Sequence, residues 1–471
     1  MTKVSQPAQL PSPANPTAKK TVAKLTFWPL VAATFFMVSG GTYGTEEIVH
    51  GAGYGRAILI LIFTPLLWSL PTALMIGELS SALPEEGGYY AWVRRGLGNF
   101  WGFQEAWLSL AASIFDMAIY PTLFVGYLTQ VAPWFHEAHR GVIVGLFVVI
   151  ACTGLNLAGI RVVGFTSLWL FFLLSSPFAL IVLLSPFRTG ALTETHVSPA
   201  TSTVGLLAGI LIAMWNYMGW DNASTIAQEV EQPQRTYPRA MIAAVILVSV
   251  SYILPFSAVY VAGVPASAFA GDGAWAQVAG LIAGTWHGAN WLGFLLVLGG
   301  MMSAFGMFNA LVMSYSRVPF AMARDGMLPL VLARIHPKTR APWVAIMVCA
   351  AGWALCLGLG FERLVTLDIM LYGASLMLEF VTLVALRIRE PELKREFRVP
   401  GGLLGAVLTG VFPLLLLVLA LVNGHHETVL GMNGLTFGAL IIGIGFVMYF
   451  ATAKLRREAL PRAVVEGAEV S

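Results

Sequence analysis

Long apolar runs separated by short polar segments dominate the pattern of this chain. Each run is continuous rather than alternating, which excludes a β-barrel of the outer-membrane kind. Each is also close to the roughly 20 residues that cross a bilayer core as a helix. The runs lie at approximately 27–50, 57–82, 100–130, 141–160, 163–187, 203–228, 239–263, 289–316, 342–359, 363–387, 404–423 and 432–453. The sequence therefore predicts an all-α membrane protein with twelve transmembrane helices.

Two of these runs are interrupted by glycine-rich polar stretches at corresponding places in the two halves of the chain. The interruptions are Ser39–Glu47 in the first run and Asn216–Asn222 in the sixth. A break in a membrane helix survives where its freed backbone groups line a protein cavity or meet a ligand. Matching breaks in both halves are typical of transporters built from inverted repeats. We therefore expect a binding site between the two breaks.

The matching breaks also predict the domain organisation. Two units of five spans have opposite orientations because five is an odd number. We expect a 5+5 inverted repeat with discontinuous helices 1 and 6, followed by two extra C-terminal spans. The expected boundaries are a disordered tail at 1–24, the first repeat at 25–188, the second repeat at 203–388, spans 11 and 12 at 403–453, and a tail at 454–471. A short helix is expected at 274–283, within the longest external loop.

The positions of the basic residues indicate the orientation in the membrane. With a cytoplasmic N-terminus, every Lys and Arg falls on a cytoplasmic segment except Arg56, Arg140, Arg188 and Arg363. An excess of Lys and Arg on the cytoplasmic side is the general rule for membrane proteins. We therefore expect a multi-pass protein of the plasma (inner) membrane, embedded in its lipid bilayer, with both termini in the cytoplasm. The net charge of +3 reflects this topology and does not indicate nucleic acid as a partner.

Composition and motifs narrow the function to transport. The chain is 11% charged, with a mean hydropathy of +0.77, whereas a soluble domain carries roughly 25% charged residues. Cys152, Cys349 and Cys356 lie in apolar runs without disulfide or metal-ligand spacing. No HExxH, GxSxG or paired His/Cys motif occurs in any run. We therefore expect no enzyme activity, no cofactor and no metal site. A channel needs a polar stripe along several spans, and the acids here are isolated instead.

Carboxylates inside apolar runs are the main functional candidates, because an ionised group at the bilayer centre costs roughly 3 kcal/mol without a partner. Glu46 lies at the end of the first break, Asp116 lies in the middle of the third run, and Asp221 lies in the second break. The helix N-terminus after a break attracts anions. Glu46 already occupies that position, which favours ligands with amino groups. Helix capping is the alternative role for Glu46 and Asp221.

Other polar and aromatic residues suit a ligand with amines. Aromatic faces attract ammonium groups by about 0.5–2 kcal/mol, and Trp215, Tyr217 and Trp220 surround the second break, with interior packing as the alternative. Weaker candidates of the same lining kind are Tyr43, Tyr120 and Asn309. Further acids near membrane depth, which are either proton-relay groups or structural partners, are Glu78, Glu105 and Glu379.

The chain resembles the amino acid–polyamine–organocation (APC) superfamily from Lys24 to about Tyr449. The resemblance is carried by Ser39–Glu46, Glu78–Ser80, Pro84–Tyr89, Trp101–Gln104, Asp116–Pro121, Asp221–Pro238 and Met322–Pro329. Within the superfamily these segments are most similar to the polyamine:proton symporters of plants and protozoan parasites. The resemblance implies a broken-helix, inverted-repeat fold (the LeuT-like fold) and proton-coupled uptake.

A more distant similarity, to the arginine/agmatine antiporters, implies roles for single residues. By this resemblance Ser39, Gly40 and Gly41 offer backbone groups to the ligand, Asp116 contacts it, Trp215 is an aromatic gate, and Asp221 affects proton dependence. Where amino-acid carriers have a Gly-Ser-Gly cradle for a carboxylate, this chain reads Gly44-Thr45-Glu46. Leu311 stands where the plant carriers have an acid. The expected substrate-binding residues are Ser39, Gly40, Gly41, Tyr43, Glu46, Asp116, Tyr120, Trp215, Tyr217, Asp221 and Asn309.

The leading hypothesis is a secondary active transporter that takes up polyamines or other small organic cations, such as putrescine, spermidine or agmatine, together with protons. An amino-acid permease of the same superfamily, working by proton symport or by exchange, is the alternative. Sodium is the less favoured coupling ion, although Ser303 and first-span carbonyls offer it oxygen ligands. Run 163–187 lacks the Lys that some proton-coupled members carry. The sequence does not indicate the oligomeric state.

Overall fold

A computed structural model describes residues 24–85, 87–158, 160–187, 203–271, 273–284, 290–424, 428–429 and 431–452. The two expected terminal tails lie outside these residues, apart from Lys24. The expected connection between the repeats, 189–202, also lies outside them.

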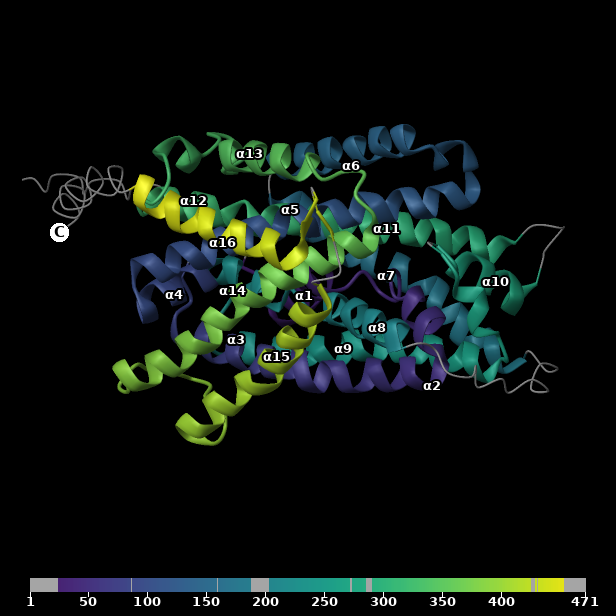
Figure 1. Ribbon diagram of the computed structural model, residues 1–471, viewed down its shortest axis with the longest axis horizontal. Helices are drawn as coiled ribbons and strands as arrows, with labels where there is room; N and C mark the ends of the chain where they lie inside the picture. Colours follow the sequence, from purple (N-terminus) through teal and green to yellow (C-terminus); the bar gives the residue numbers. More distant parts are fainter. Residues whose placement is uncertain are drawn as a thin grey trace, which may run out of the picture.

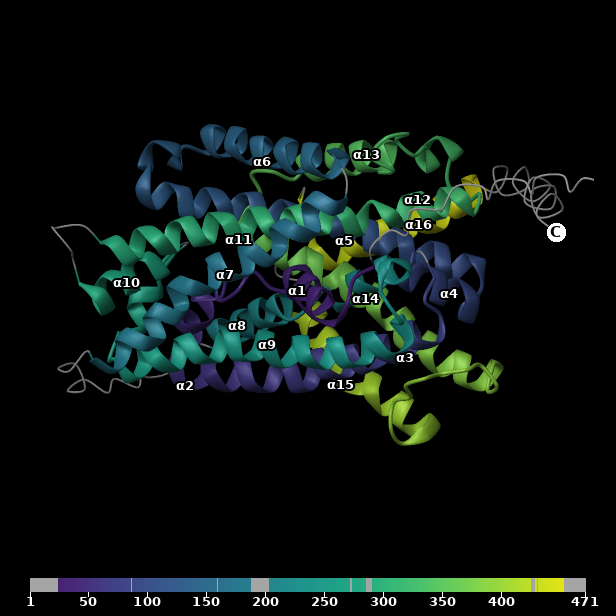
Figure 2. The same cartoon turned by 180° about the vertical axis from the view of Figure 1, so that it is seen from behind.

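The described residues are almost entirely helical, and most helices follow the long axis of the molecule (Figures 1 and 2). The α-helices are α1 (Phe27–Val38), α2 (Glu46–Thr64), α3 (Leu70–Ala82), α4 (Tyr89–Leu97), α5 (Asn99–Val131), α6 (Ala138–Ala158), α7 (Ile160–Leu184), α8 (Thr203–Asn216), α9 (Pro233–Val261), α10 (Trp275–Ala283), α11 (Trp291–Tyr315), α12 (Arg317–Arg324), α13 (Trp343–Ala354), α14 (Phe361–Arg389), α15 (Gly402–Gly424) and α16 (Gly434–Ala451).

Shorter elements join these helices. A π-helical turn, η1 (Pro65–Ser69), connects α2 to α3. The 3₁₀ segments are η2 (Pro133–His136), η3 (Ser185–Phe187), η4 (Trp220–Glu229), η5 (Ala266–Phe269) and η6 (Leu330–Ala333). The strands β1 (Thr428–Val429) and β2 (Met432–Asn433) form a small antiparallel hairpin before α16. The short helix expected at 274–283 is present as α10.

Nine helical segments of the described chain are long and apolar enough to cross a membrane, and α1 and α13 are shorter apolar helices. The predicted multi-span, all-helical membrane architecture is therefore confirmed. One of the nine segments, Glu46–Ala82, contains the end of the first expected span and all of the second, with a kink at Gly53 (φ 73°, ψ 161°). The total of twelve spans and the inverted repeat stay predictions.

The two ends of the long axis differ in charge. Helix α4 lies at one end and α10 at the opposite end (Figure 1). We call the first the Arg-rich end, because α4, α12 and the last turn of α14 place basic residues there. These are Arg94, Arg95, Arg324, Arg387 and Arg389. At this surface the Arg95 guanidinium donates two hydrogen bonds to Glu390, of 3.1 and 2.8 Å, and holds the pKa of that carboxyl below its usual value.

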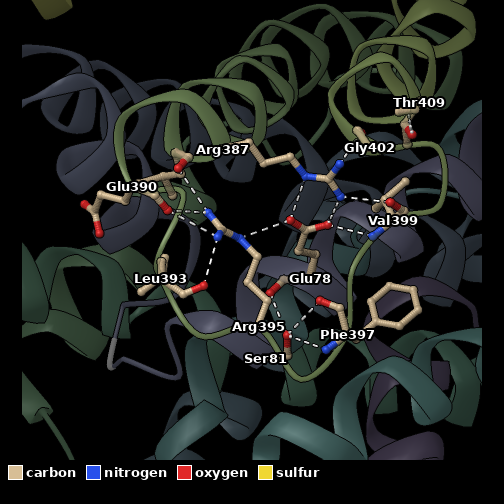
Figure 3. Close-up of polar contacts among 12 residues, drawn as sticks. Glu78, Ser81, Arg387, Glu390, Leu393, Arg395, Phe397, Val399, Gly402 and Thr409 are labelled. Atoms are coloured by element: carbon tan, nitrogen blue, oxygen red, sulfur yellow. Dashed lines mark hydrogen bonds and ion pairs between the residues drawn. The ribbon is translucent and has the colours of Figure 1, made fainter.

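A buried carboxylate ties three segments together at the Arg-rich end (Figure 3). Glu78 of α3 is fully buried. Its Oε1 accepts a 2.9 Å hydrogen bond from Nε of Arg387 on α14 and lies 3.3 Å from Nε of Arg395. Its Oε2 accepts hydrogen bonds from the Arg387 guanidinium and, at 2.7 Å, from the backbone N–H of Val399. Of the two roles left open for Glu78, these contacts favour the structural one.

Candidate functional site

The first helix break, Ser39–Thr45, is an irregular stretch between α1 and α2. Gly41 and Gly44 have φ values of 81° and 80°, in the left-handed region that favours glycine. Gly40 is required by a close approach instead, because a Cβ there would lie 2.1 Å from Oγ of Ser303 on α11. The Ser303 hydroxyl donates a 2.5 Å hydrogen bond to the Gly40 carbonyl. The break predicted in the first span is thus present and is held against α11.

The second break, Tyr217–Gly219, ends α8 and lies directly against the first. Gly219 has a φ of 89°, and a Cβ there would lie 2.7 Å from the carbonyl oxygen of Met37 on α1. The carbonyl of Asn216, freed at the end of α8, accepts a 2.8 Å hydrogen bond from the Tyr252 hydroxyl. Irregular backbone at membrane depth needs such partners. The Asn216 side-chain amide also donates a 3.3 Å hydrogen bond to the Gly44 carbonyl, so the tertiary structure brings the two predicted breaks into contact.

Glu46 stands at the start of α2 and is 4% exposed. Its Oε1 accepts a hydrogen bond from the Tyr127 hydroxyl of α5. The Tyr127 ring meets the Tyr43 ring edge-on, with 5.2 Å between centroids. It also packs on Gly300 of α11, where a Cβ would lie 2.6 Å from the ring. Glu46 therefore joins the first break to α5 and α11.

Two small cavities adjoin the first break. One is bounded by Gly40, Tyr43, Tyr127, Trp215, Asn216 and Ser303, among others. The other is bounded by Glu46, Glu47, Gly44, Gly271, Gly273 and Phe361, and the two share Leu123. On the side of α10, the Trp275 indole donates a 3.0 Å hydrogen bond to the Thr42 carbonyl and covers the break.

Asp116 lies in the middle of α5 and is 4% exposed. Its Oδ1 accepts hydrogen bonds from the Tyr120 hydroxyl at 2.8 Å and the Trp215 indole at 3.3 Å, and its Oδ2 accepts one from the Tyr315 hydroxyl at 2.9 Å. All three donors are neutral. Within the described chain no Lys or Arg pairs with this carboxylate. The protein therefore orients its charge without neutralising it.

Trp215 stands between the cavity and Asp116. One edge of the indole donates to Asp116, while the ring lines the cavity and lies beside Gly44, where a Cβ would be 3.4 Å away. Tyr120 packs against the indole with 6.2 Å between ring centroids, and Phe361 meets it edge-on at 5.5 Å. The aromatic position predicted from the sequence therefore separates Glu46 from Asp116.

Asp221 is the second residue of η4 and is 3% exposed. Its Oδ1 accepts a 2.5 Å hydrogen bond from the Tyr372 hydroxyl of α14, which in turn accepts a 3.1 Å hydrogen bond from the backbone N–H of Gly219. Asp221 also lies within electrostatic range of Asp116. The second break and the carboxylate group are thus connected through α14.

Asp368 of α14 belongs to the same group, although it was not among the residues expected from the sequence. It is fully buried, and neither of its oxygens has a hydrogen-bond partner in the described structure. It interacts electrostatically with Asp116 and Asp221, and also with Tyr120 and Tyr315. The sequence signal is weaker for Asp368 than for Asp116, because Arg363 begins the same apolar run five residues earlier.

Three of the expected site residues use their side chains in hydrogen bonds within the protein. The Tyr217 hydroxyl donates a 2.9 Å hydrogen bond to the Leu61 carbonyl. The Asn309 Oδ1 accepts a 2.8 Å hydrogen bond from Asn156 of α6. The Ser39 hydroxyl accepts a 3.0 Å hydrogen bond from the Gly41 N–H within the first break. The expected residues that the structure brings together are Asp116, Tyr120, Trp215 and Asp221.

Comparison with known proteins agrees with this architecture. The chain is 34% identical over 427 residues to the polyamine transporter RMV1 of Arabidopsis thaliana, covering 90% of this chain and 84% of that protein. It is 34% identical over 440 residues to the polyamine transporter PUT1 of Oryza sativa subsp. japonica, covering 91% and 78%. It is 26% identical over 389 residues to the serine/threonine exchanger SteT of Bacillus subtilis (strain 168), covering 81% and 86%.

The family match extends over nearly the whole helical bundle. It covers residues 31–447, which include both breaks and every carboxylate described above. The superfamily resemblance seen in the motifs is therefore confirmed, and the chain belongs to the amino acid permease family.

Proposed function

We propose that this protein is a secondary active transporter that takes up polyamines or other small organic cations across the plasma membrane, together with protons. The carboxylates of Asp116, Asp221 and Asp368 carry the proposal. They are buried at membrane depth and have no Lys or Arg partner among the described residues. Buried charges require a partner, and a ligand ammonium group supplies one. The 34% identity to proteins named polyamine transporters supports the same substrate class.

The arrangement suits a ligand with two separated amines. A linear polyamine carries an ammonium group at each end of a flexible alkyl chain. Asp116 with Asp368 offers one anionic position, and Glu46, on the other side of Trp215, offers a second. The rings of Trp215 and Phe361 lie between these positions, where they suit alkyl contact and cation–π attraction of about 0.5–2 kcal/mol.

Asp368 also compensates for the absence of an acid at position 311. Leu311 precedes Tyr315 by one turn of α11, and Tyr315 donates to Asp116 while lying within electrostatic range of Asp368. Helix α14 thus supplies a carboxylate close to the place where α11 lacks one. This supports recognition of more than one amine.

Transport of amino acids is the second candidate, and the similarity to the serine/threonine exchanger favours it. An amino-acid carrier needs a position for the substrate carboxylate, which the N-terminus of α2 would provide. Glu46 begins that helix. Its charge repels a substrate carboxylate, so the polyamine is the better match.

A ligand screen by thermal denaturation of the purified protein separates the two candidates. We expect putrescine, spermidine or agmatine to raise the melting temperature more than leucine, alanine or glutamate does. A ligand at 100 times its Kd stabilises the folded state by about 2.7 kcal/mol. Stronger stabilisation by a neutral amino acid would replace the polyamine proposal with the amino-acid one.

For coupling, we propose that protons rather than sodium drive uptake and that Asp221 takes part. Its position between the second break and the other carboxylates supports a role in proton movement. In proteoliposomes, uptake should require an inward proton gradient and no sodium. Asp221→Asn should weaken the pH dependence of uptake more than it weakens substrate binding. Sodium-driven uptake with no response to a proton gradient would contradict this mechanism.

For topology, we propose twelve spans arranged as a 5+5 inverted repeat, with repeats at 25–188 and 203–388, two further spans at 403–453, and cytoplasmic termini. The hydrogen bond from the Asn216 amide to the Gly44 carbonyl, which joins the two predicted breaks, supports the repeat. Tags fused to the two termini should both be inaccessible to external protease in intact cells. Cleavage of either tag would require a different orientation.

A further inference from the structure

Polar side chains form a seam between α5 and α14 that runs from Asp116 toward the Arg-rich end. On α5, Glu105 and Asp116 are eleven residues apart, and on α14 the same spacing separates Asp368 and Glu379. Eleven residues make just over three helical turns, so each pair shares a helix face with a separation of about 16 Å. The two helices pack along each other. The seam therefore has a carboxylate pair at each end, Asp116 with Asp368 and Glu105 with Glu379.

The pair nearer the Arg-rich end is buried and incompletely bonded. Glu105 is fully buried and Glu379 is 1% exposed. Oε1 of Glu105 accepts a 2.5 Å hydrogen bond from the Ser375 hydroxyl. Its Oε2 and both oxygens of Glu379 have no hydrogen-bond partner in the described structure. Glu379 interacts electrostatically with Glu105, so the unbonded oxygens of the two carboxyl groups lie near each other.

Among the described residues, no cation is an electrostatic partner of Glu379. It meets Glu105 of α5, Asp221 of η4, Tyr89 of α4 and Tyr372 of its own helix. Helices α8 and α15 also pack against α14 and contain no titratable residue. Two neighbouring carboxylates in a low-dielectric interior cannot both be ionised without a compensating positive charge. One of the two therefore carries a proton.

We propose that Glu105 and Glu379 form a proton-binding pair, which holds the co-transported proton apart from the substrate. This inference rests on the proposed proton-coupled uptake and assigns its proton to residues outside the substrate site. A proton on Asp116 would compete with an ammonium group for the same oxygens. A proton about 16 Å further along the seam can stay bound while the substrate is present, as co-transport of both requires.

Two hydroxyl groups lie between the two ends of the seam. Tyr372 and Ser375 lie between Asp368 and Glu379 on one face of α14, and their hydroxyls donate to Asp221 and Glu105, respectively. In the transfer step, a carboxyl oxygen of Asp221 loses the proton and a carboxylate oxygen of Glu105 or Glu379 gains it. Release to the Arg-rich side, the cytoplasm in the proposed topology, completes the transfer.

The test uses Glu379→Gln and Glu105→Gln in the full-length protein, with Glu137→Gln, at an exposed acid outside the seam, as the matched control. Glutamine resembles a protonated glutamate but cannot release a proton. In proteoliposomes, putrescine counterflow without a pH gradient should match the wild type in all three variants. An inward gradient of one pH unit should concentrate putrescine up to about tenfold per coupled proton in the wild type and the control. It should produce no accumulation in the two seam variants.

Infrared spectroscopy of the purified protein at neutral pH provides a readout that needs no substrate. The carboxylic-acid carbonyl band should weaken or shift in each seam variant and stay unchanged in the control. Gradient-driven accumulation in Glu379→Gln equal to the wild type, or a carbonyl band unchanged in both variants, would overturn the inference. If wild-type protein shows the band but no putrescine counterflow, the proposed substrate is wrong and the proton-binding pair stands.

Discussion

The sharpest test of the substrate site is Asp116→Asn, which removes a charge while keeping the shape of the side chain. The asparagine oxygen can still accept from Tyr120 and Trp215, which now bond to Oδ1 at 2.8 and 3.3 Å. The amide nitrogen replaces Oδ2, and the Tyr315 hydroxyl, now a 2.9 Å donor, can rotate to accept from it. All three contacts are therefore available to the variant, and the loss of negative charge is the main change.

The size of the effect follows from this substitution. A hydrogen bond to a charged group contributes about 1.5–3 kcal/mol, so spermidine should bind about 10- to 150-fold more weakly. The melting temperature of the ligand-free protein should not fall, because an uncompensated buried charge is removed. Calorimetric titration with spermidine gives the Kd. Tyr315→Phe is the matched control, since it removes one donor to Asp116 and leaves the charge. Equal affinity of wild type and Asp116→Asn for every ligand would show that Asp116 is structural.

Three further variants test other parts of the structure. Asp368→Asn should weaken spermidine binding about tenfold. It should not lower the melting temperature, because neither oxygen of Asp368 has a hydrogen-bond partner within the described chain. A variant that binds spermidine normally but melts at a lower temperature would contradict the place of Asp368 in the site. Gly40→Ala should lower the free energy of unfolding by about 1–3 kcal/mol, because the new Cβ would lie 2.1 Å from Ser303 Oγ. Gly55→Ala, where a Cβ meets nothing within 4 Å, should melt like the wild type, and equal melting of both glycine variants would refute the packing argument. Glu78→Gln should cost about 3–5 kcal/mol in a detergent unfolding titration, since it leaves two arginines without their buried partner; a loss below about 1 kcal/mol would show that the cluster is dispensable.

Much of the candidate site could be predicted because the membrane makes local sequence informative. A glycine-rich break or an acid within an apolar run is unfavourable in lipid wherever it occurs, so Ser39–Glu47, Asp116 and Asp221 stand out without knowledge of the fold. The same rule points less clearly to Asp368, because Arg363 lies five residues before it in the run 363–387. Only the tertiary structure shows that the charged partners of Asp368 are Asp116 and Asp221.

The roles of the remaining residues depended on partners distant in the chain. Glu78 looked equivalent to Glu105 and Glu379, yet Arg387 and Arg395 neutralise it from more than 300 residues away. Asn309 bonds to Asn156 across a helix interface and is not gathered with the carboxylates. No local pattern distinguishes a paired acid from an unpaired one, because the difference lies in which helix faces it.

The sequence by itself determined that this is a helical membrane protein with two broken helices and with carboxylates at membrane depth. The physical reason is that the free energy of placing a segment in the bilayer depends on that segment alone. It is set by the hydropathy of the segment and by its unpaired backbone and charged groups. Only the tertiary structure decided that the two breaks touch and that α14 brings Asp368 to Asp116. It also paired Glu78 with two arginines while leaving Glu379 with other acids. Those outcomes depend on how the helices pack and in which register, which is set by side chains that are distant in sequence and adjacent in space.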